Sequence, residues 1–156
     1  MGYNIKIGNA EPLAEEGRFL WRIEEIELDE APSFINDDVT GQSNCRCPSY
    51  SGWAGFCQET GLHELFLEPW SGLMSEHPGI VPITEEHHTK ISKALDKFNN
   101  EHPTTTPGFG HEPHNPHSKP WDGIDPHSGC LARLIWLEWW FRWALDNCKH
   151  PAIQNS

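Results

Sequence analysis

Histidines are concentrated in a proline-rich part of the chain, residues 101–127, where their spacing suggests metal binding. Imidazole nitrogens are good ligands for zinc, copper and nickel. Together with a carboxylate such as Asp122 or Asp125, they would hold a metal that lowers the pKa of a bound water and so generates a nucleophile. This interpretation predicts a metal-dependent hydrolase whose candidate zinc ligands are His111, His114, His117 and His127.

The same segment also fits a solvated loop without a dedicated metal site. Residues 101–125 contain five prolines and three glycines, and they show neither helical nor strand periodicity. A catalytic metal site usually depends on rigid elements, so adventitious chelation is the alternative interpretation. No zinc-protease helix, nucleophile elbow, phosphate-binding loop or dinucleotide-binding fingerprint occurs in the sequence. We therefore expect no catalytic residue, and no cofactor apart from the zinc of the hydrolase hypothesis.

Tryptophans form the second candidate site, on a helix that we predict from Asp125-Pro126 to about Asn147. At roughly 100° per residue, its four tryptophans fall on one flank and Arg133 lies beside them. A guanidinium keeps its proton, so Arg133 needs a carboxylate, an aromatic face or a ligand anion as its partner. Aromatic walls with a few polar groups are typical of small-molecule sites. The candidate binding residues are Arg133, Trp136, Trp140, Trp143 and Asn147.

A structural interpretation of this stripe remains open. Four large aromatic side chains on one flank are typical of a hydrophobic core or of a subunit interface. Arg133 would then pair with an internal acid, or lie across Trp136 or Trp140 as a cation–π contact. Under that interpretation the stripe contains no ligand site.

Alternating apolar residues near the N-terminus predict two half-buried strands. The first strand contains Tyr3, Ile5 and Ile7, and the second contains Phe19, Trp21 and Ile23. The segment between them is polar and contains Pro12 and Gly17. This arrangement predicts a β-hairpin.

Three segments have the caps and the apolar spacing of helices. One begins at Ser49 or Ser51 and ends at Gly61, one begins at Thr84 and fades at residues 99–100, and the third is the tryptophan-rich helix. Residues 62–67 fit either a further helical turn or a short strand. The sequence thus predicts an α+β fold of one domain, residues 1–156, with an N-terminal β-hairpin packed against about three helices and with long irregular loops.

The chain of 156 residues carries 23 acidic and 11 basic side chains, which gives a net charge of −12. Duplex DNA and anionic membranes attract clustered Lys and Arg, so we expect neither as a partner. No stretch has the length and apolar character of a membrane span, and the N-terminus lacks the layout of a secretory signal, which predicts a cytoplasmic protein. Five cysteines are too few for a disulfide-built domain, so we expect reduced thiols.

Three stretches of the chain, residues 31–44, 48–62 and 147–156, resemble small proteins encoded by bacteriophages. The resemblance spans most of the chain, but it implies a context and no activity, and it brings no catalytic residue with it. Small acidic phage proteins often act inside a bacterium by binding, blocking or sequestering a host component. The resemblance therefore implies a binding protein in the cytoplasm of the host cell.

These observations lead to one main prediction and two alternatives. The main prediction is a small non-catalytic binding protein of phage type, acting inside the cell. It would engage a host protein, or sequester a small nucleotide-like ligand, through the aromatic and arginine face around Arg133. The alternatives are the metal-dependent hydrolase that uses residues 111–127, and a self-associating structural protein with the tryptophans at the subunit contact.

Overall fold

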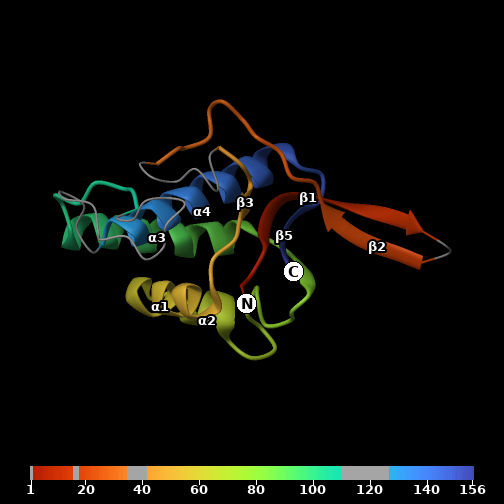
Figure 1. Cartoon of the computed structure of the whole chain (residues 1–156), viewed down its shortest axis with the longest axis horizontal. Helices are drawn as coiled ribbons and strands as arrows, with labels where there is room; N and C mark the ends of the chain where they lie inside the picture. Colours follow the sequence, from red (N-terminus) through yellow and green to blue (C-terminus); the bar gives the residue numbers. More distant parts are fainter. Residues whose placement is uncertain (1, 16–17, 35–41, 110–126) are drawn as a thin grey trace.

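The computed structural model describes residues 2–15, 18–34, 42–109 and 127–156. Within them the protein is an α+β fold of four helices and a five-stranded, antiparallel, curled sheet (Figure 1). The strands are β1 (Ile5–Glu15), β2 (Arg18–Ile23), β3 (Cys45–Arg46), β4 (Gly79–Pro82) and β5 (Pro151–Asn155). The helices are α1 (Tyr50–Thr60), α2 (His63–Leu67), α3 (Glu85–Glu101) and α4 (Ser128–Asn147).

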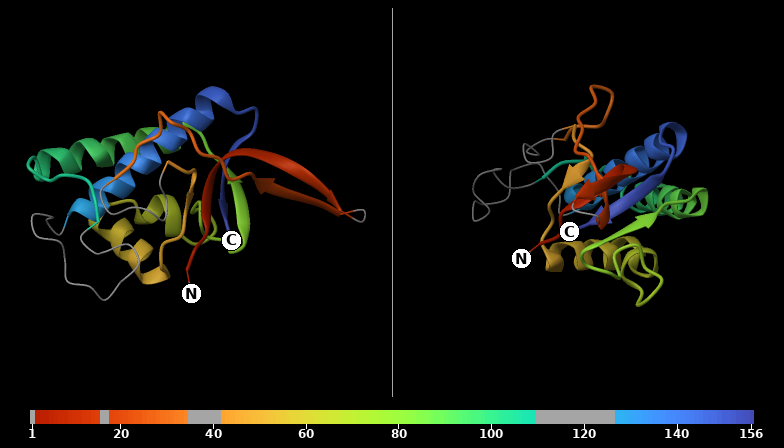
Figure 2. Two further views of the ribbon diagram at one scale, coloured as in Figure 1. Left: turned by 45° about the horizontal axis from the view of Figure 1, so that its top comes forward. Right: turned by 90° about the vertical axis from the view of Figure 1, so that its right-hand side faces the viewer.

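The first strand, β1, changes its pairing partner along its length. Residues 5–9 pair with β5, whereas residues 10–15 pair with β2, so the order of the sheet is β2-β1-β5-β4. The short strand β3 pairs with the start of β1. The predicted N-terminal hairpin is present, but its bounds differ: residues 10–15, which the sequence analysis placed in the polar segment between the two strands, form the half of β1 that pairs with β2, whereas the expected first strand around Ile5 and Ile7 pairs with β5. The far half of the hairpin does not pack against helices as we expected, but extends away from the rest of the protein as two strands (Figure 1, Figure 2).

Two helices begin at the capping residues that the sequence indicates, and one of them, α1, also ends at the expected residue. The Ser49 hydroxyl accepts a hydrogen bond from the Gly52 amide at 3.1 Å, and Gly61 ends α1 with a left-handed φ of 74°. Thr84 Oγ1 accepts from the His87 amide at 3.3 Å, while the Thr84 amide donates to His87 Nδ1 at 3.0 Å. The predictions of α1 and α3 are confirmed. Of the two alternatives for residues 62–67, the helical one is confirmed, because residues 63–67 form α2, and this brings the expected number of about three helices to four within the described residues.

The main core lies between the sheet and the helices. Ile5, Ile7 and Ile153, on β1 and β5, are buried in one apolar cluster with side chains of the helices. The predicted tryptophan-rich helix is confirmed as α4, although its expected start at Asp125-Pro126 lies outside the described residues. The large side chains that α4 contributes to this core are Leu131, Leu134, Trp136, Leu137, Trp140 and Phe141. All five cysteines are free thiols, as expected.

The opposite face of the sheet carries a second, smaller apolar cluster. Successive side chains on a strand point to opposite faces, so Ala152 lies on the other face from its neighbour Ile153. Ala10, Ile23 and Ala152 form this cluster, and the half-buried Ile80 packs against it. The sheet thus separates the main core from a second apolar surface.

Candidate functional site

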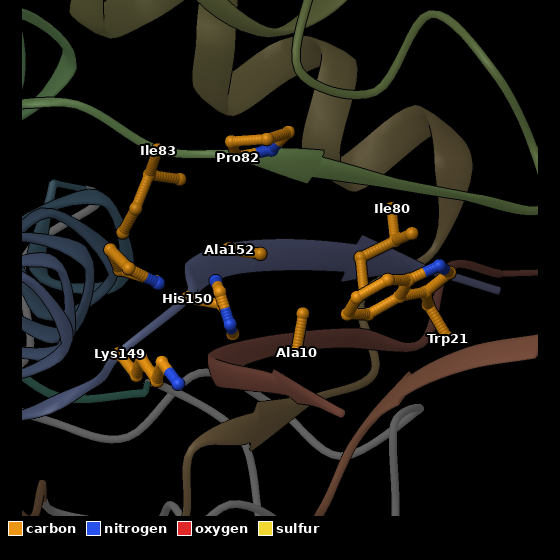
Figure 3. A pocket seen from close by; sticks show the side chains of 9 residues that line it. Ala10, Trp21, Ile80, Pro82, Ile83, Lys149, His150 and Ala152 are labelled. Atoms are coloured by element: carbon orange, nitrogen blue, oxygen red, sulfur yellow. The ribbon is translucent and has the colours of Figure 1, made fainter. Parts of the chain in front are cut away.

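A groove lies over the smaller cluster, between the hairpin and the edge strand β4 (Figure 3). Its volume is about 460 Å³. Trp21 and Ile80 stand at one end of the groove and Lys149 at the other, with Ala10 and His150 between them (Figure 3). The residues that line the groove are Ala10, Trp21, Ile80, Pro82, Ile83, Lys149, His150, Pro151 and Ala152.

Strand pairing explains why a hollow forms at this place. The register sets Ala152 opposite Gly8, and Ala10 opposite Ile23. Gly8, Ala10 and Ala152 therefore place short side chains, or none, in the middle of this face, while the larger side chain of Trp21 stands at its margin. Because side chains rise on both sides of a shallow centre, the face is hollowed.

The backbone of His150 holds the rim of the groove in place. Its amide donates to Asn9 Oδ1 at 2.8 Å, and its carbonyl accepts from the Ala10 amide at 2.9 Å. The His150 ring lies edge to face with the indole of Trp21, with 6.3 Å between the ring centroids. Trp21 is nevertheless 49% exposed, so a large part of its indole is accessible to a ligand.

The ionisable side chains that line the groove are basic, whereas the chain as a whole is acidic. Among the nine residues that line the groove, Lys149 and His150 carry the ionisable side chains, and neither is acidic. The whole chain has a net charge of −12. A basic surface in an acidic protein attracts anions locally, because the nearest charges dominate within a Debye length of about 8 Å at physiological ionic strength. The groove therefore combines an apolar floor with an end that favours negative charge.

The predicted tryptophan stripe does not form one exposed face. Trp136 and Trp140 are fully buried, and Trp136 Nε1 donates to the Ser43 carbonyl at 3.0 Å. Trp143 is half-buried. Asn147 is exposed, and its side-chain amide donates to the Trp143 carbonyl of its own helix at 2.9 Å. The stripe is therefore largely core, with Trp143 and Asn147 at its surface end.

Arg133 stacks on an aromatic ring, but on a different ring from those expected. Its Cζ lies 5.4 Å from the centre of the Phe109 ring, where the sequence suggested Trp136 or Trp140. Arg46 of β3, which is 6% exposed, lies 5.0 Å from the same Phe109 ring and 5.6 Å from Trp136. Arg46 was not among the predicted site residues, because no periodicity or motif marks its position. Two guanidinium groups thus share the faces of one phenylalanine, which is an arrangement that cation–π attraction favours.

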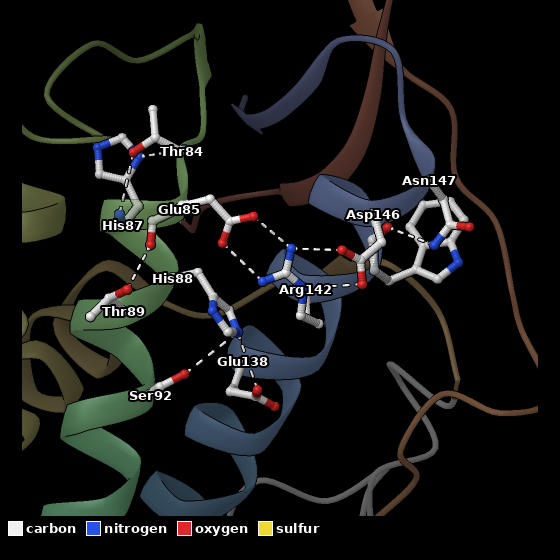
Figure 4. A network of polar contacts seen from close by, with 11 residues as sticks. Thr84, Glu85, His87, His88, Thr89, Ser92, Glu138, Arg142, Asp146 and Asn147 are labelled. Carbon is white, nitrogen blue, oxygen red and sulfur yellow. Dashed lines mark hydrogen bonds and ion pairs between the residues drawn. The ribbon is translucent and has the colours of Figure 1, made fainter.

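The polar side of α4 is joined to the start of α3 by Arg142 (Figure 4). Its guanidinium donates to both carboxylate oxygens of Glu85, at 2.7 and 2.9 Å, and to both oxygens of Asp146, at 2.7 and 3.1 Å. The hydrogen bonds from Arg142 hold the pKa of Glu85 below its ordinary value. Below Arg142, His88 Nε2 lies 3.1 Å from Glu138 Oε1. These contacts fix the two helices against each other.

We expect Arg142→Ala to lower the melting temperature by about 2 °C at low salt, and by less in 1 M NaCl, because the pair is solvent-exposed. The depressed pKa of Glu85 means that the stabilisation is present above pH 4.5 and is lost as the pH falls through the folded-state pKa. Melting curves at pH 7 and pH 3 measure this difference. Lys90→Ala, which breaks only the exposed pair with Glu86, is the control. A decrease in melting temperature that does not depend on salt or pH would contradict the stabilising role assigned to the ion pair between Arg142 and Glu85.

His127 belongs to a polar cluster at the start of α4. Its Nδ1 lies 2.7 Å from Glu59 Oε1, and its ring stacks on His102 with 3.8 Å between the centroids. The Cys130 thiol donates to Glu59 Oε2 at 3.1 Å. Burial alone would raise the pKa of Glu59, but the hydrogen bonds from Cys130 and His127 outweigh it and lower the pKa. Burial and Glu59 together raise the pKa of Cys130 to about 12, so this thiol is a poor nucleophile.

The remaining candidate zinc ligands, His111, His114 and His117, lie outside the described residues. The same holds for Asp122 and Asp125. Within the described part of the chain, no group of three or more histidine, cysteine or acidic side chains is arranged to hold a metal ion. The hydrolase hypothesis therefore stays a prediction from the sequence.

Comparison with models of protein families, with curated proteins and with solved structures finds no match for this chain. The resemblance to bacteriophage proteins accordingly stays a hypothesis. None of the helices in the described ranges combines the length and the apolar character that crossing a membrane requires.

Proposed function

We propose that this chain is a non-catalytic binding protein, and that its groove holds a flat apolar group that carries negative charge. The observation that supports the proposal is the composition of the groove: an exposed indole at one end, small apolar residues in the middle, and Lys149 at the other end (Figure 3). The volume of about 460 Å³ lies within the range of roughly 300–1,000 Å³ that is typical of ligand sites.

Each part of the groove has a separate role in this proposal. The exposed part of Trp21 offers an aromatic surface on which a flat ring can pack, and such pairs favour offset or edge-to-face geometry. Lys149 supplies a flexible point charge for an anionic group. Ala10 and Ala152 allow the ligand to approach the sheet closely because their side chains are short.

This chemistry agrees with both kinds of partner that the sequence suggested. A nucleotide-like ligand has a flat base and an anionic phosphate, and an acidic, aromatic segment of a host protein presents the same two features. The location differs from the sequence-based prediction: we place the contact at Trp21 and Lys149, because Trp136 and Trp140 lie in the core. Trp143 and Asn147, at the end of α4, remain on the surface.

Two probes of matched shape test the proposal: naphthalene-1-sulfonate and the neutral naphthalene-1-methanol, each titrated into the protein by calorimetry or NMR. We expect the sulfonate to bind about fivefold more tightly, as one ion pair of about 1 kcal/mol allows. Trp21→Ala should weaken both probes by tenfold or more, as the loss of roughly 1.5–3 kcal/mol of aromatic burial requires. Lys149→Gln should remove the preference for the sulfonate and leave the neutral probe unchanged.

The control is Lys90→Gln, which removes an equal charge from α3, where it does not line the groove. This variant should bind both probes like the natural protein. Equal binding by the Trp21→Ala variant, or an equal loss of sulfonate affinity in Lys90→Gln and Lys149→Gln, would contradict the proposed site.

A further inference from the structure

A second exposed indole lies at the tip of the loop that follows α2. Trp70 is 99% exposed, and its backbone adopts a positive φ of 73°. A bulky residue in this left-handed region is strained, and a wholly exposed indole leaves a large apolar surface in water. Both costs suggest that another surface covers Trp70 when the protein acts.

Hydrogen bonds at its base hold this loop in one conformation. The Gly72 amide donates to the Glu68 carbonyl at 2.8 Å, and the Leu73 amide donates to the Leu65 carbonyl at 2.9 Å. The side chain of Leu73 is buried in the main core. At Gly72, a Cβ atom would lie 2.5 Å from the Phe66 carbonyl oxygen, so only glycine allows this close approach of the backbone. These contacts thus hold the loop in one conformation, in which Trp70 projects into solvent.

The charge around Trp70 complements the charge of the groove. Residues 62–79 contain three glutamates, at positions 64, 68 and 76, and contain neither lysine nor arginine. All three are exposed. The groove presents Lys149 and His150 beside its apolar floor. The Trp70 loop is therefore itself a flat apolar group with negative charge close by, which is the chemistry that the groove selects.

We propose that the Trp70 loop of one copy of the chain docks in the groove of a second copy. The inference rests on the proposed function, because it names one occupant of the same groove. Among the residues whose side-chain exposure the structure describes, a set that leaves out residues 13–20, the exposed large apolar side chains are Trp21 and Trp70. One contact of this kind removes both of them from water.

The contact joins two different surfaces, the Trp70 loop and the groove. Two copies that exchange loops form a closed, isologous dimer, whereas docking in one direction only is heterologous and continues into a short chain of copies. An aromatic side chain buries about 150–250 Å², far below the roughly 1,200–2,000 Å² of a stable interface. We therefore expect association with a Kd of about 10–100 μM rather than a permanent dimer.

Complementation between two variants tests the contact, with sedimentation velocity as the measurement. Trp70→Ala keeps the groove and loses the docking side chain, whereas Lys149→Glu keeps the side chain and reverses the charge of the groove. The natural protein should associate over about 10–500 μM, and each variant alone should sediment as a monomer. An equal mixture of the two variants should regain association, because the intact loop of one can enter the intact groove of the other.

The outcomes separate this inference from the function on which it rests. A natural protein that is monomeric at about 500 μM overturns the docking proposal, and association that persists in Trp70→Ala does the same. If naphthalene-1-sulfonate still binds to that monomer through Trp21, the proposed function stands without the self-contact. If the sulfonate fails to bind while the mixture of variants associates, the small-ligand function fails and the docking stands. Circular dichroism and the unfolding midpoint of each variant establish that it is folded, and Trp70→Phe should retain association.

Discussion

Replacing Trp136 with alanine is expected to lower the free energy of unfolding by about 3–5 kcal/mol, the range measured for large aromatic side chains in cores. Trp136 is fully buried in α4, and its indole donates to the Ser43 carbonyl at 3.0 Å. Domains are stable by only about 5–15 kcal/mol, so the variant should lose a large fraction of the total free energy of unfolding. Urea unfolding followed by circular dichroism measures the loss.

Phenylalanine substitutions separate packing from hydrogen bonding at this site. Trp136→Phe leaves the Ser43 carbonyl without its donor, whereas the buried Trp140 Nε1 has no hydrogen-bond partner within the described residues. An unmet buried polar group costs about 1–3 kcal/mol. We therefore expect Trp136→Phe to be more destabilising than Trp140→Phe by about 1–2 kcal/mol. Equal losses would mean that the bond to Ser43 contributes nothing measurable.

Asn44→Ala should lower the free energy of unfolding by about 2–4 kcal/mol, because it leaves several backbone groups unpaired in a buried place. Asn44 is 0% exposed. Its Oδ1 accepts from the Ile26 amide at 2.8 Å, and its Nδ2 donates to the carbonyls of Ile7 and Glu24 at 3.0 and 2.9 Å. The side chain therefore connects β1 to the segment after β2. The measurement is again urea unfolding.

Two further variants make this prediction specific to the amide. Asn44→Asp keeps an acceptor for Ile26, but it loses both donated bonds and sets a buried carboxylate oxygen against the carbonyls of Ile7 and Glu24, so at pH 7 it should cost more than alanine. Gln42→Ala removes an amide that also bonds to two carbonyls, those of Asp29 and Ala31, at 2.7 and 3.1 Å, but less of it is buried. We expect a loss below about 1 kcal/mol there. A larger loss at Gln42 than at Asn44 would contradict the role assigned to burial.

Local signals were sufficient for three of the helices and for the presence of the two N-terminal strands, but not for their pairing, because residues 5–9 of β1 pair with β5 and residues 10–15 pair with β2. The alternation of Ile5 and Ile7 with polar neighbours, and the caps at Ser49 and Thr84, act within a few residues, so the sequence alone reveals them. The strands β4 and β5 gave no such signal. β4 has four residues and ends in Pro82, and β5 begins with Pro151, after residues 148–150 that follow α4. Their extended conformation depends on pairing with each other and with β1, which joins segments that are far apart in the sequence.

The candidate site was harder to predict for the same reason. Helical periodicity correctly placed the tryptophans of α4 on one flank, but it does not say what covers that flank. The sheet and its neighbours cover Trp136 and Trp140, while Phe109, from another segment, lies against Arg133. The groove takes its lining from the hairpin, from β4 and from β5. The exposure of Trp21 is the feature that identifies the groove, and strand alternation alone predicts an inward position for that residue.

The change of partner in β1 gives its two halves different dynamics. Residues 5–9 lie within the sheet, whereas residues 10–15 belong to a ladder of two strands, which is marginally stable without further support. Such a ladder can fray from its free end without unfolding the protein as a whole. Because Trp21 sits on this ladder, fraying would move one wall of the groove while Ile5 and Ile7 stay in place. Local opening of the hairpin therefore sets the rate at which a ligand leaves the groove. The free energy of this opening is a small fraction of the free energy of global unfolding.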